Sequence, residues 1–182
     1  MQTLRKLRGI LENLGGEEHY LFSVSDFFPI FPELAVEALR MLLCRAAAAE
    51  LLQRVCKGIY LYPKAPYPKG LVLYHTAARL REDSFSYLSM ESVLSETGII
   101  SQMPLGWITV MTRGRSGKIS CGKWGVIEFI HTKKSPERIR GHIQFDKRRK
   151  LWRAGVPLAL RDMQNAKRPK DLIDWSVAHE FL

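Results

Sequence analysis

The fold class that the sequence predicts is α+β, with two domains joined by a short linker. Apolar residues recur at steps of three and four in 2–14 and 34–42, which indicates amphipathic helices. The runs 107–112 and 124–131 are rich in β-branched and aromatic residues and predict strands. Between these regions, PKAPYPKG contains three prolines and a glycine and indicates a stiff, extended linker. The expected division of the chain is therefore a first domain, the linker and a second domain, over 1–62, 63–70 and 71–182.

The first domain is expected to be a winged helix-turn-helix. Ser25 stands where a helix N-cap is expected, and a longer helix begins near Pro32-Glu33, because proline and glutamate suit a first helical turn. The apolar runs 51–55 and 59–62 flank Lys57-Gly58, which is the signal for a β-hairpin. In such a domain the second helix of the turn enters a DNA major groove, and the hairpin touches the backbone beside it.

The second domain is expected to be a small mixed α/β domain. Ser89 is a candidate N-cap followed by an acidic first turn, and Gly98 is a suitable stop for the helix between them. The other expected helices are 71–81, 151–166 and 171–181. The expected strands are 107–112, 118–121, 124–131 and 141–146.

Length and composition are those of a globular protein without a membrane span. Hydrophobic residues make up 46% of the chain and charged residues 25%, so disorder is not expected. No apolar run reaches the roughly 18 residues that a membrane span needs. The three cysteines, Cys44, Cys56 and Cys121, are odd in number and show no CxxC spacing. This favours a reducing cytoplasmic compartment over a disulfide framework or a zinc site.

Motifs for catalysis are not found in the sequence. The histidines show no metal-ligand spacing such as HExxH, and no serine or cysteine stands in a nucleophile motif. Asp83, Glu91 and Glu96 form the one conceivable carboxylate set, but Glu91 and Glu96 are five residues apart, which a helix does not place on one face. The glycine-containing stretch 114–118 lacks the spacing of a phosphate-binding loop. We therefore expect neither an enzyme nor a bound cofactor or metal.

The positive charge is concentrated in the second half of the chain. The net charge is +10, from 28 basic and 18 acidic residues. Residues 1–68 hold 8 Lys/Arg against 7 Asp/Glu, whereas residues 113–170 hold 17 against 4. Such an excess predicts a polyanion or an acidic protein surface as partner. Because phosphate neutralisation supplies most non-specific DNA affinity, the second half is expected to assist DNA binding or to meet a different partner.

Two stretches of the sequence resemble the AbiEi family of antitoxins from bacterial abortive-infection toxin–antitoxin systems. Residues 45–60, RAAAAELLQRVCKGIY, resemble that family's helix end and wing. Residues 87–100, YLSMESVLSETGII, followed by ITVMT at 108–112, resemble a more specific motif of its second domain. The resemblance implies a transcriptional autorepressor that binds inverted repeats of double-stranded DNA in its own promoter. It also implies a nucleotidyltransferase toxin as a partner, and no enzymatic activity of the antitoxin itself.

Basic residues are the candidate nucleic-acid contacts. Arg40 and Arg45 lie on the expected recognition helix, where an arginine can bind guanine and contribute about 1–3 kcal/mol of base discrimination. An ion pair between Arg40 and Glu37 is the alternative for Arg40. Arg54 and Lys57 lie in the hairpin and are candidates for phosphate contact. The candidates of the second domain lie on a glycine-rich connection and in a basic run, and are Arg113, Arg115, Lys118, Lys147, Arg148, Arg149 and Lys150.

Two other functions compete with autorepression. One is a subunit or adaptor of a larger nucleoprotein complex, in which the basic half binds an RNA or DNA backbone and the near-neutral first domain makes protein contacts. The other is a toxin inhibitor whose basic half binds an acidic protein. The charge distribution favours the adaptor, whereas the resemblance favours the autorepressor.

Overall fold

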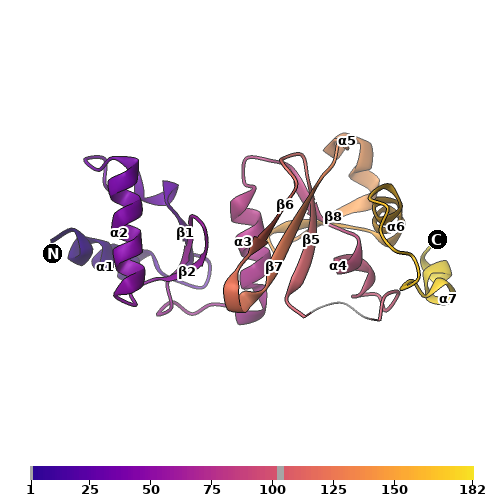
Figure 1. Cartoon of the computed structure of the whole chain (residues 1–182), viewed down its shortest axis with the longest axis horizontal. Coiled ribbons are helices and arrows are strands. Elements are labelled where there is room, and N and C mark those ends of the chain that lie inside the picture. Colours follow the sequence, from indigo (N-terminus) through magenta and orange to yellow (C-terminus); the bar gives the residue numbers. More distant parts are fainter. Residues whose placement is uncertain (1, 102–104) are drawn as a thin grey trace. The chain divides into compact units, whose positions relative to one another are not determined.

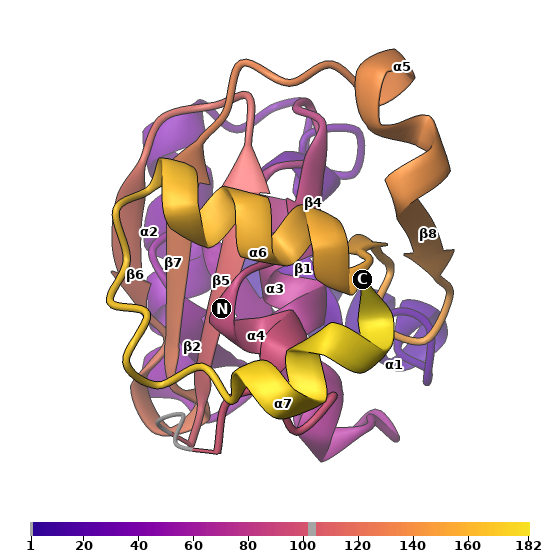
Figure 2. The same cartoon turned by 90° about the vertical axis from the view of Figure 1, so that its right-hand side faces the viewer.

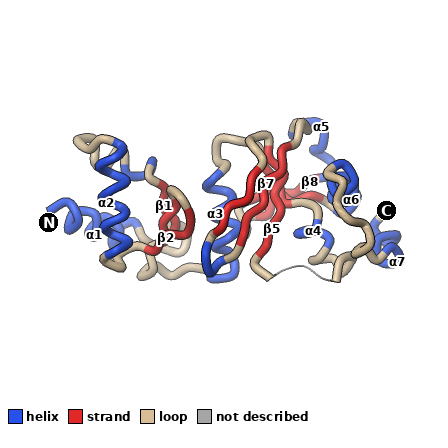
Figure 3. Tube along the Cα trace, in the orientation of Figure 1, coloured by secondary structure: helices blue, strands red, loops and turns tan. Residues whose placement is uncertain are grey.

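The computed structural model describes residues 2–101 and 105–182 of the chain. They form two compact units, Met1–Val72 and Leu73–Leu182. Helices and strands alternate in both, so the fold is α+β (Figures 1 and 3). Within the described ranges, no helix has the length and apolar character needed to cross a membrane.

The first unit builds a small antiparallel sheet against helices. Its elements, in chain order, are α1 (Gln2–Leu14), β1 (Leu21–Ser23), η1 (Ser25–Phe27), α2 (Val36–Ala48), β2 (Gln53–Cys56) and β3 (Ile59–Leu61). Strand β3 lies between β1 and β2 and is antiparallel to both. The hairpin turn falls at Lys57-Gly58, as predicted, and Gly58 takes the positive φ (85°) that a tight two-residue turn requires.

The core of the first unit joins α1 and α2. Leu7 and Leu11 on α1 and Leu39 and Leu43 on α2 have no exposed surface. In each helix the two residues are four positions apart, so they lie on one face, and the two helices are in contact. Burial of these leucines is the main reason that the amphipathic patterns in the sequence become packed helices.

Helix α2 begins at Val36, later than the expected start near Pro32-Glu33. Residues 28–34 form hydrogen-bonded turns instead, in which the Phe27 carbonyl accepts the N–H groups of Ile30 (3.2 Å) and Phe31 (3.0 Å). Ala35 then caps α2 in an extended conformation (ψ 154°) without a side-chain hydrogen bond. The first turn of the expected helix is thus replaced by local turns. The short helix expected to follow an N-cap at Ser25 is the 3-10 helix η1, whose N-cap is Val24 and whose first residue is Ser25.

The segment 63–70, expected as an extended linker, packs on the first unit. Tyr67 stacks on Tyr20, with ring centroids 5.4 Å apart, and Ala65 is buried. The Tyr62 N–H donates to the Tyr20 carbonyl over 2.8 Å, which holds the start of the segment beside β1. The prolines therefore shape a segment that covers a buried tyrosine.

The second unit is built on a six-stranded mixed sheet. Its strands are β4 (Ser86–Leu88), β5 (Trp107–Thr112), β6 (Gly117–Ser120), β7 (Val126–His131), β8 (Ile143–Asp146) and β9 (Leu151–Ala154), and their order in the sheet is β6-β7-β5-β4-β9-β8. The pairs β5–β7 and β4–β9 are parallel and the others are antiparallel. The 3-10 helix η2 (Lys69–Leu71) ends the first unit and leads into α3 (Val72–Leu80). The other helices of the second unit are α4 (Glu91–Leu94), η3 (Gly122–Trp124), α5 (Pro136–Ile139), η4 (Arg140–His142), α6 (Val156–Asn165), α7 (Trp175–Ala178) and η5 (His179–Phe181).

Helices cover both faces of this sheet. Figures 1 and 2 show α3 on one face, and α4 and α6 on the other. Residues Val110, Ile127 and Phe129 in the central strands have at most 1% of their surface exposed, as expected for strands covered on both sides.

Residues 151–154 form strand β9, whereas a helix over 151–166 was expected. Trp152 pairs with Phe145 of β8 and with Tyr87 of β4, so the strand is held on both sides. Gly155, in an extended conformation (ψ 165°), then caps α6, and Pro157 lies in the first turn of that helix. Because residues 151–154 pair with β4 and β8, they form a strand, and the helix covers only the later part of the range 151–166.

Two other expected helices of the second unit are shorter than the sequence suggested. Ser89 does not cap a helix, because its hydroxyl group donates to Asp162 (2.7 Å), and α4 begins only after Met90, which has a positive φ (55°). The last α-helix covers Trp175–Ala178 and is capped by Asp174, whose carboxylate accepts the N–H groups of Ser176 and Val177.

Candidate nucleic-acid interfaces and a basic hollow

The two candidate arginines of α2 flank its buried face on opposite sides. Arg40 and Arg45 are both exposed, but five residues of helix rotate the chain by about 140° beyond one turn, so the two side chains point in different directions. The Arg40 guanidinium donates to Glu37 over 3.1 Å, so the ion pair considered as the alternative is present. Within the described residues, Arg45 forms no ion pair.

The outermost face of α2 carries little positive charge. It presents Glu37, Met41 and Cys44, and Met41 is 55% exposed. A helix that reads DNA places basic and amide side chains on this face. The structure thus leaves Arg45 as the available arginine of α2 and places Met41, a member of the apolar pattern over 34–42, on the exposed face.

The hairpin candidates differ in their availability. Lys57 is exposed at the turn and has no ion pair among the described residues. Arg54 is also exposed, but its Nε–H donates to the Cys56 carbonyl over 3.4 Å, which ties it to its own strand. Lys57 is therefore the hairpin residue best placed to meet a phosphate group.

The glycine-rich connection between β5 and β6 carries two exposed arginines, and the lysine that follows it in β6 is engaged. Lys118 is engaged, because its ammonium group pairs with Glu128 (3.7 Å) and lies 5.1 Å from the centre of the Trp107 ring. Arg115 is exposed and has no ion pair among the described residues, and its carbonyl accepts a hydrogen bond from Arg81 (3.1 Å). Arg113 is also exposed on this connection.

The basic run 147–150 forms the turn between β8 and β9, and only part of it faces solvent freely. Lys147 and Arg148 are exposed, with no ion pair within the described ranges. Arg149 pairs with Glu96 (2.7 Å) and Asp146 (3.0 Å) and lies over the Tyr74 ring. Lys150 holds the turn in a left-handed conformation (φ 56°).

Beside this turn two aromatic side chains are exposed. The rings of Phe145 and Trp152 meet edge to face with centroids 5.4 Å apart, and they are 45% and 39% exposed. Aromatic side chains next to cations are typical of surfaces that bind single-stranded nucleic acid, because bases stack on the rings.

Asp146 organises the β8–β9 turn and gives it a defined pH dependence. Burial works against its charged form, but the N–H groups of Arg149 and Arg148 and the Arg149 guanidinium hold the pKa of Asp146 below its ordinary value. A lowered pKa means that the carboxylate stabilises the fold above its unfolded pKa, near 4, and that this contribution is lost as the pH falls further. We expect Asp146→Asn to lower the free energy of unfolding by about 1 kcal/mol at pH 7. In urea titrations this difference should shrink below pH 4, and a pH-independent difference would contradict it.

The carboxylates Asp83, Glu91 and Glu96 each have different surroundings in the structure. Glu91 pairs with Arg168 (3.4 Å), and Glu96 pairs with Arg149 and Arg153. Asp83 is exposed in the turn after α3. Across residues 2–101 and 105–182, no group of three or more metal-ligating side chains is arranged to hold an ion.

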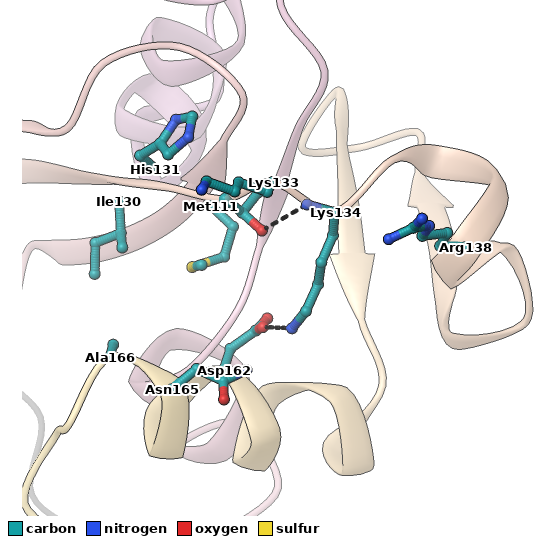
Figure 4. Close-up of a pocket in the computed structure, with 10 residues that line it drawn as sticks. Met111, Ile130, His131, Lys133, Lys134, Arg138, Asp162, Asn165 and Ala166 are labelled. Atoms are coloured by element: carbon teal, nitrogen blue, oxygen red, sulfur yellow. Dashed lines mark hydrogen bonds and ion pairs between the residues drawn. The ribbon is translucent and has the colours of Figure 1, made fainter.

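A basic hollow lies between β7, α5 and α6 (Figure 4). It was not identified from the sequence, and none of its lining residues was a candidate contact. Its volume is about 320 Å³, and the residues that line it are Met111, Ile130, His131, Thr132, Lys133, Lys134, Arg138, Asp162, Asn165 and Ala166. A second hollow of about 260 Å³ shares Lys134, Arg138 and Asn165 with it and adds His142 and Arg161. The only sequence signal for this site is the charge excess over 113–170, which does not distinguish its residues from the rest.

One wall of the hollow is fixed by a buried carboxylate. Asp162 has no exposed surface and accepts hydrogen bonds from the hydroxyl groups of Tyr87 (3.0 Å) and Ser89 (2.7 Å). The Lys134 ammonium, which comes from the segment after β7, forms an ion pair with it (Figure 4). Burial, and then the charge of Asp162, raise the pKa of Tyr87, so the phenol remains a proton donor at neutral pH.

Comparison of the sequence with protein-family models gives no match, and comparison with curated proteins gives none either.

Proposed function

We propose that this protein is a DNA-binding transcriptional autorepressor of the AbiEi antitoxin type, whose first 62 residues act as a winged helix-turn-helix. The observation that carries the proposal is the element order of the first unit, in which helices alternate with strands and β3 lies between β1 and β2. That order places a helix, α2, immediately before a hairpin with a short exposed turn. Such a helix and hairpin are the two parts that contact DNA in winged-helix proteins.

The available cations limit how the first unit would bind DNA. Of the four candidate cations of α2 and the hairpin, Arg45 and Lys57 remain to contact DNA, while Arg40 and Arg54 have partners within the unit. Two cations support only weak neutralisation of phosphate, so a stable complex requires two copies on an inverted repeat or help from the basic second unit.

Substitution of the hairpin and helix cations tests this proposal. We expect Lys57→Ala to weaken binding to the upstream duplex and to a scrambled duplex by similar factors, and to reduce the salt dependence by about one counterion. Arg45→Ala should instead reduce the preference for the upstream duplex over the scrambled one, by about 1–3 kcal/mol if it contacts a base. Lys64→Ala, an exposed lysine outside α2 and the hairpin, is the matched control. Unchanged affinity in both test variants would contradict the proposal.

A second candidate function is supported by specific observations. The outer face of α2 is apolar and acidic, with Met41 and Glu37 at its centre, which favours a protein contact over a DNA contact there. Phe145 and Trp152 lie beside the exposed Lys147 and Arg148, which favours an unpaired strand of RNA or DNA on the second unit. Together these features suit a nucleic-acid-binding subunit of a larger nucleoprotein complex.

A further inference from the structure

The hollow between β7, α5 and α6 has the chemistry of a nucleotide site. We propose that it binds a phosphate-bearing nucleotide, with the base against its apolar floor and the phosphate group at its basic rim, where Lys133 and Arg138 lie on either side of Lys134 (Figure 4). This proposal does not depend on the winged helix or on DNA binding by the first unit. It concerns residues of the second unit alone.

Size and lining suit a single nucleotide. A volume of about 320 Å³ lies at the lower end of the range of small-molecule sites, about 300–1,000 Å³. Met111, Ile130 and Ala166 supply apolar surface, and the side-chain amide of Asn165 supplies a donor and an acceptor at the end of α6. An apolar floor with one amide group is how proteins hold a base and read its edge.

Two cations that line the hollow form no ion pair with the rest of the described chain. Lys133 and Arg138 are exposed and, among the described residues, form no ion pair. Asp162 is the one carboxylate in the lining of either hollow, and it is already satisfied by Lys134 and two hydroxyl groups. An anion at the rim of the hollow therefore finds a cation on either side of Lys134 without a competing acid, and the planar Arg138 guanidinium can bind a phosphate group through two hydrogen bonds.

The wall that carries these residues is held in place before any ligand binds. The Lys134 N–H donates to the Thr132 hydroxyl group (3.2 Å), and the Lys134 ammonium is anchored to Asp162, so the segment between β7 and α5 is fixed at both its backbone and its side chain (Figure 4). In Figure 4 the Arg138 side chain extends from α5 toward this segment. Such preorganisation reduces the entropy lost when a ligand binds.

The second hollow extends the positive surface along α6. His142 and Arg161 line it, and it shares Lys134, Arg138 and Asn165 with the first. A phosphate linked to a neighbouring nucleotide would lie along this extension. The same chemistry thus fits a free nucleotide or an unpaired nucleotide of a strand, whereas a base stacked in a duplex cannot enter.

The test uses the full-length protein and four probes: AMP, inorganic phosphate, a single-stranded oligonucleotide of about eight nucleotides, and a blunt duplex of the same length. Lys133→Gln and Arg138→Gln are each expected to weaken AMP and single-strand binding about tenfold, because each removes a charged contact to phosphate. Asn165→Leu is expected to weaken binding of AMP but not of inorganic phosphate. Arg140→Gln, an exposed arginine of the same segment outside both linings, is the control and should change affinity by less than about twofold.

The outcomes separate the ligand sources and can overturn the proposal. If AMP displaces the oligonucleotide only at much higher concentration, the ligand is an unpaired strand; if it competes at equal concentration, the ligand is a free nucleotide. If Arg140→Gln weakens binding as much as the test variants do, the affinity comes from diffuse charge and there is no site. If inorganic phosphate binds as tightly as AMP, the base contributes nothing to binding and the site is not a nucleotide site. Lys57→Ala should leave AMP binding unchanged, so failure of operator binding and failure of this site are distinguishable.

Discussion

Replacing Lys134 with methionine is expected to lower the free energy of unfolding of the second unit by about 3 kcal/mol. Methionine keeps the aliphatic length of the side chain but removes the charge, which leaves the fully buried Asp162 carboxylate with only two hydroxyl donors. Breaking a buried ion pair by removing one partner costs about 3–5 kcal/mol. The lower end applies here because the Lys134 side chain is 28% exposed, so water can partly reach the carboxylate. Urea denaturation measures the difference.

A double-mutant cycle isolates the ion pair from other effects of the substitution. In Lys134→Met with Asp162→Asn the charge is removed from both partners, and asparagine can still accept the hydrogen bonds of Tyr87 and Ser89. We expect the double variant to be more stable than Lys134→Met alone, with a coupling of about 1–3 kcal/mol. The neighbouring Lys133→Met, which breaks no ion pair, should change stability by less than about 0.5 kcal/mol. A cost below 1 kcal/mol for Lys134→Met would show that the buried pair does not stabilise the fold.

The second large effect is expected at Gly125, where alanine should destabilise the protein by on the order of 3–5 kcal/mol. Gly125 has φ 119° and ψ −148°, a backbone region that only glycine adopts readily. A Cβ atom there would lie 1.8 Å from the Gly106 carbonyl oxygen, which is a backbone atom and cannot rotate away. That carbonyl accepts the Val126 N–H over 2.7 Å at the start of the parallel β5–β7 pair, so the clash would separate two central strands.

Gly117→Ala provides the matched control for this prediction. No atom lies within 4 Å of a Cβ built at Gly117, and the residue does not have a positive φ. We therefore expect a change of less than about 0.5 kcal/mol from Gly117→Ala, against a loss on the order of 3–5 kcal/mol from Gly125→Ala. Similar thermal unfolding midpoints for the two variants would contradict the account of the β5–β7 junction.

Local patterns in the sequence predicted those elements that depend on neighbouring residues. The helix over 2–14, the hairpin around Lys57-Gly58 and the strand over 107–112 were predicted and are present in the structure. Strand β9 was predicted as a helix, because its identity depends on pairing with β4 and β8, which the apolar pattern of 151–154 does not reveal. Tertiary pairing overrides propensity in such short runs.

The candidate site shows the same limit for side chains. Net charge located the basic half of the chain, and helical spacing indicated the Arg40–Glu37 pair that is found. Sequence reasoning could not tell that Arg149 is consumed by Glu96 or that Lys134 is anchored to Asp162, because those partners are separated by 53 and 28 residues. A lysine or arginine in a charged run is available to a ligand only if it forms no ion pair with a carboxylate that is distant in the sequence.

The most direct test of the central proposal is a salt-dependent binding titration of the wild-type protein. The three ligands are the DNA upstream of its own gene, a scrambled duplex of the same length and a single-stranded RNA. The proposal predicts a preference for the upstream duplex that persists at physiological salt, because base contacts are less sensitive to salt than phosphate contacts. Equal and steeply salt-dependent binding to all three ligands would contradict autorepression and would favour a subunit of a larger nucleoprotein complex.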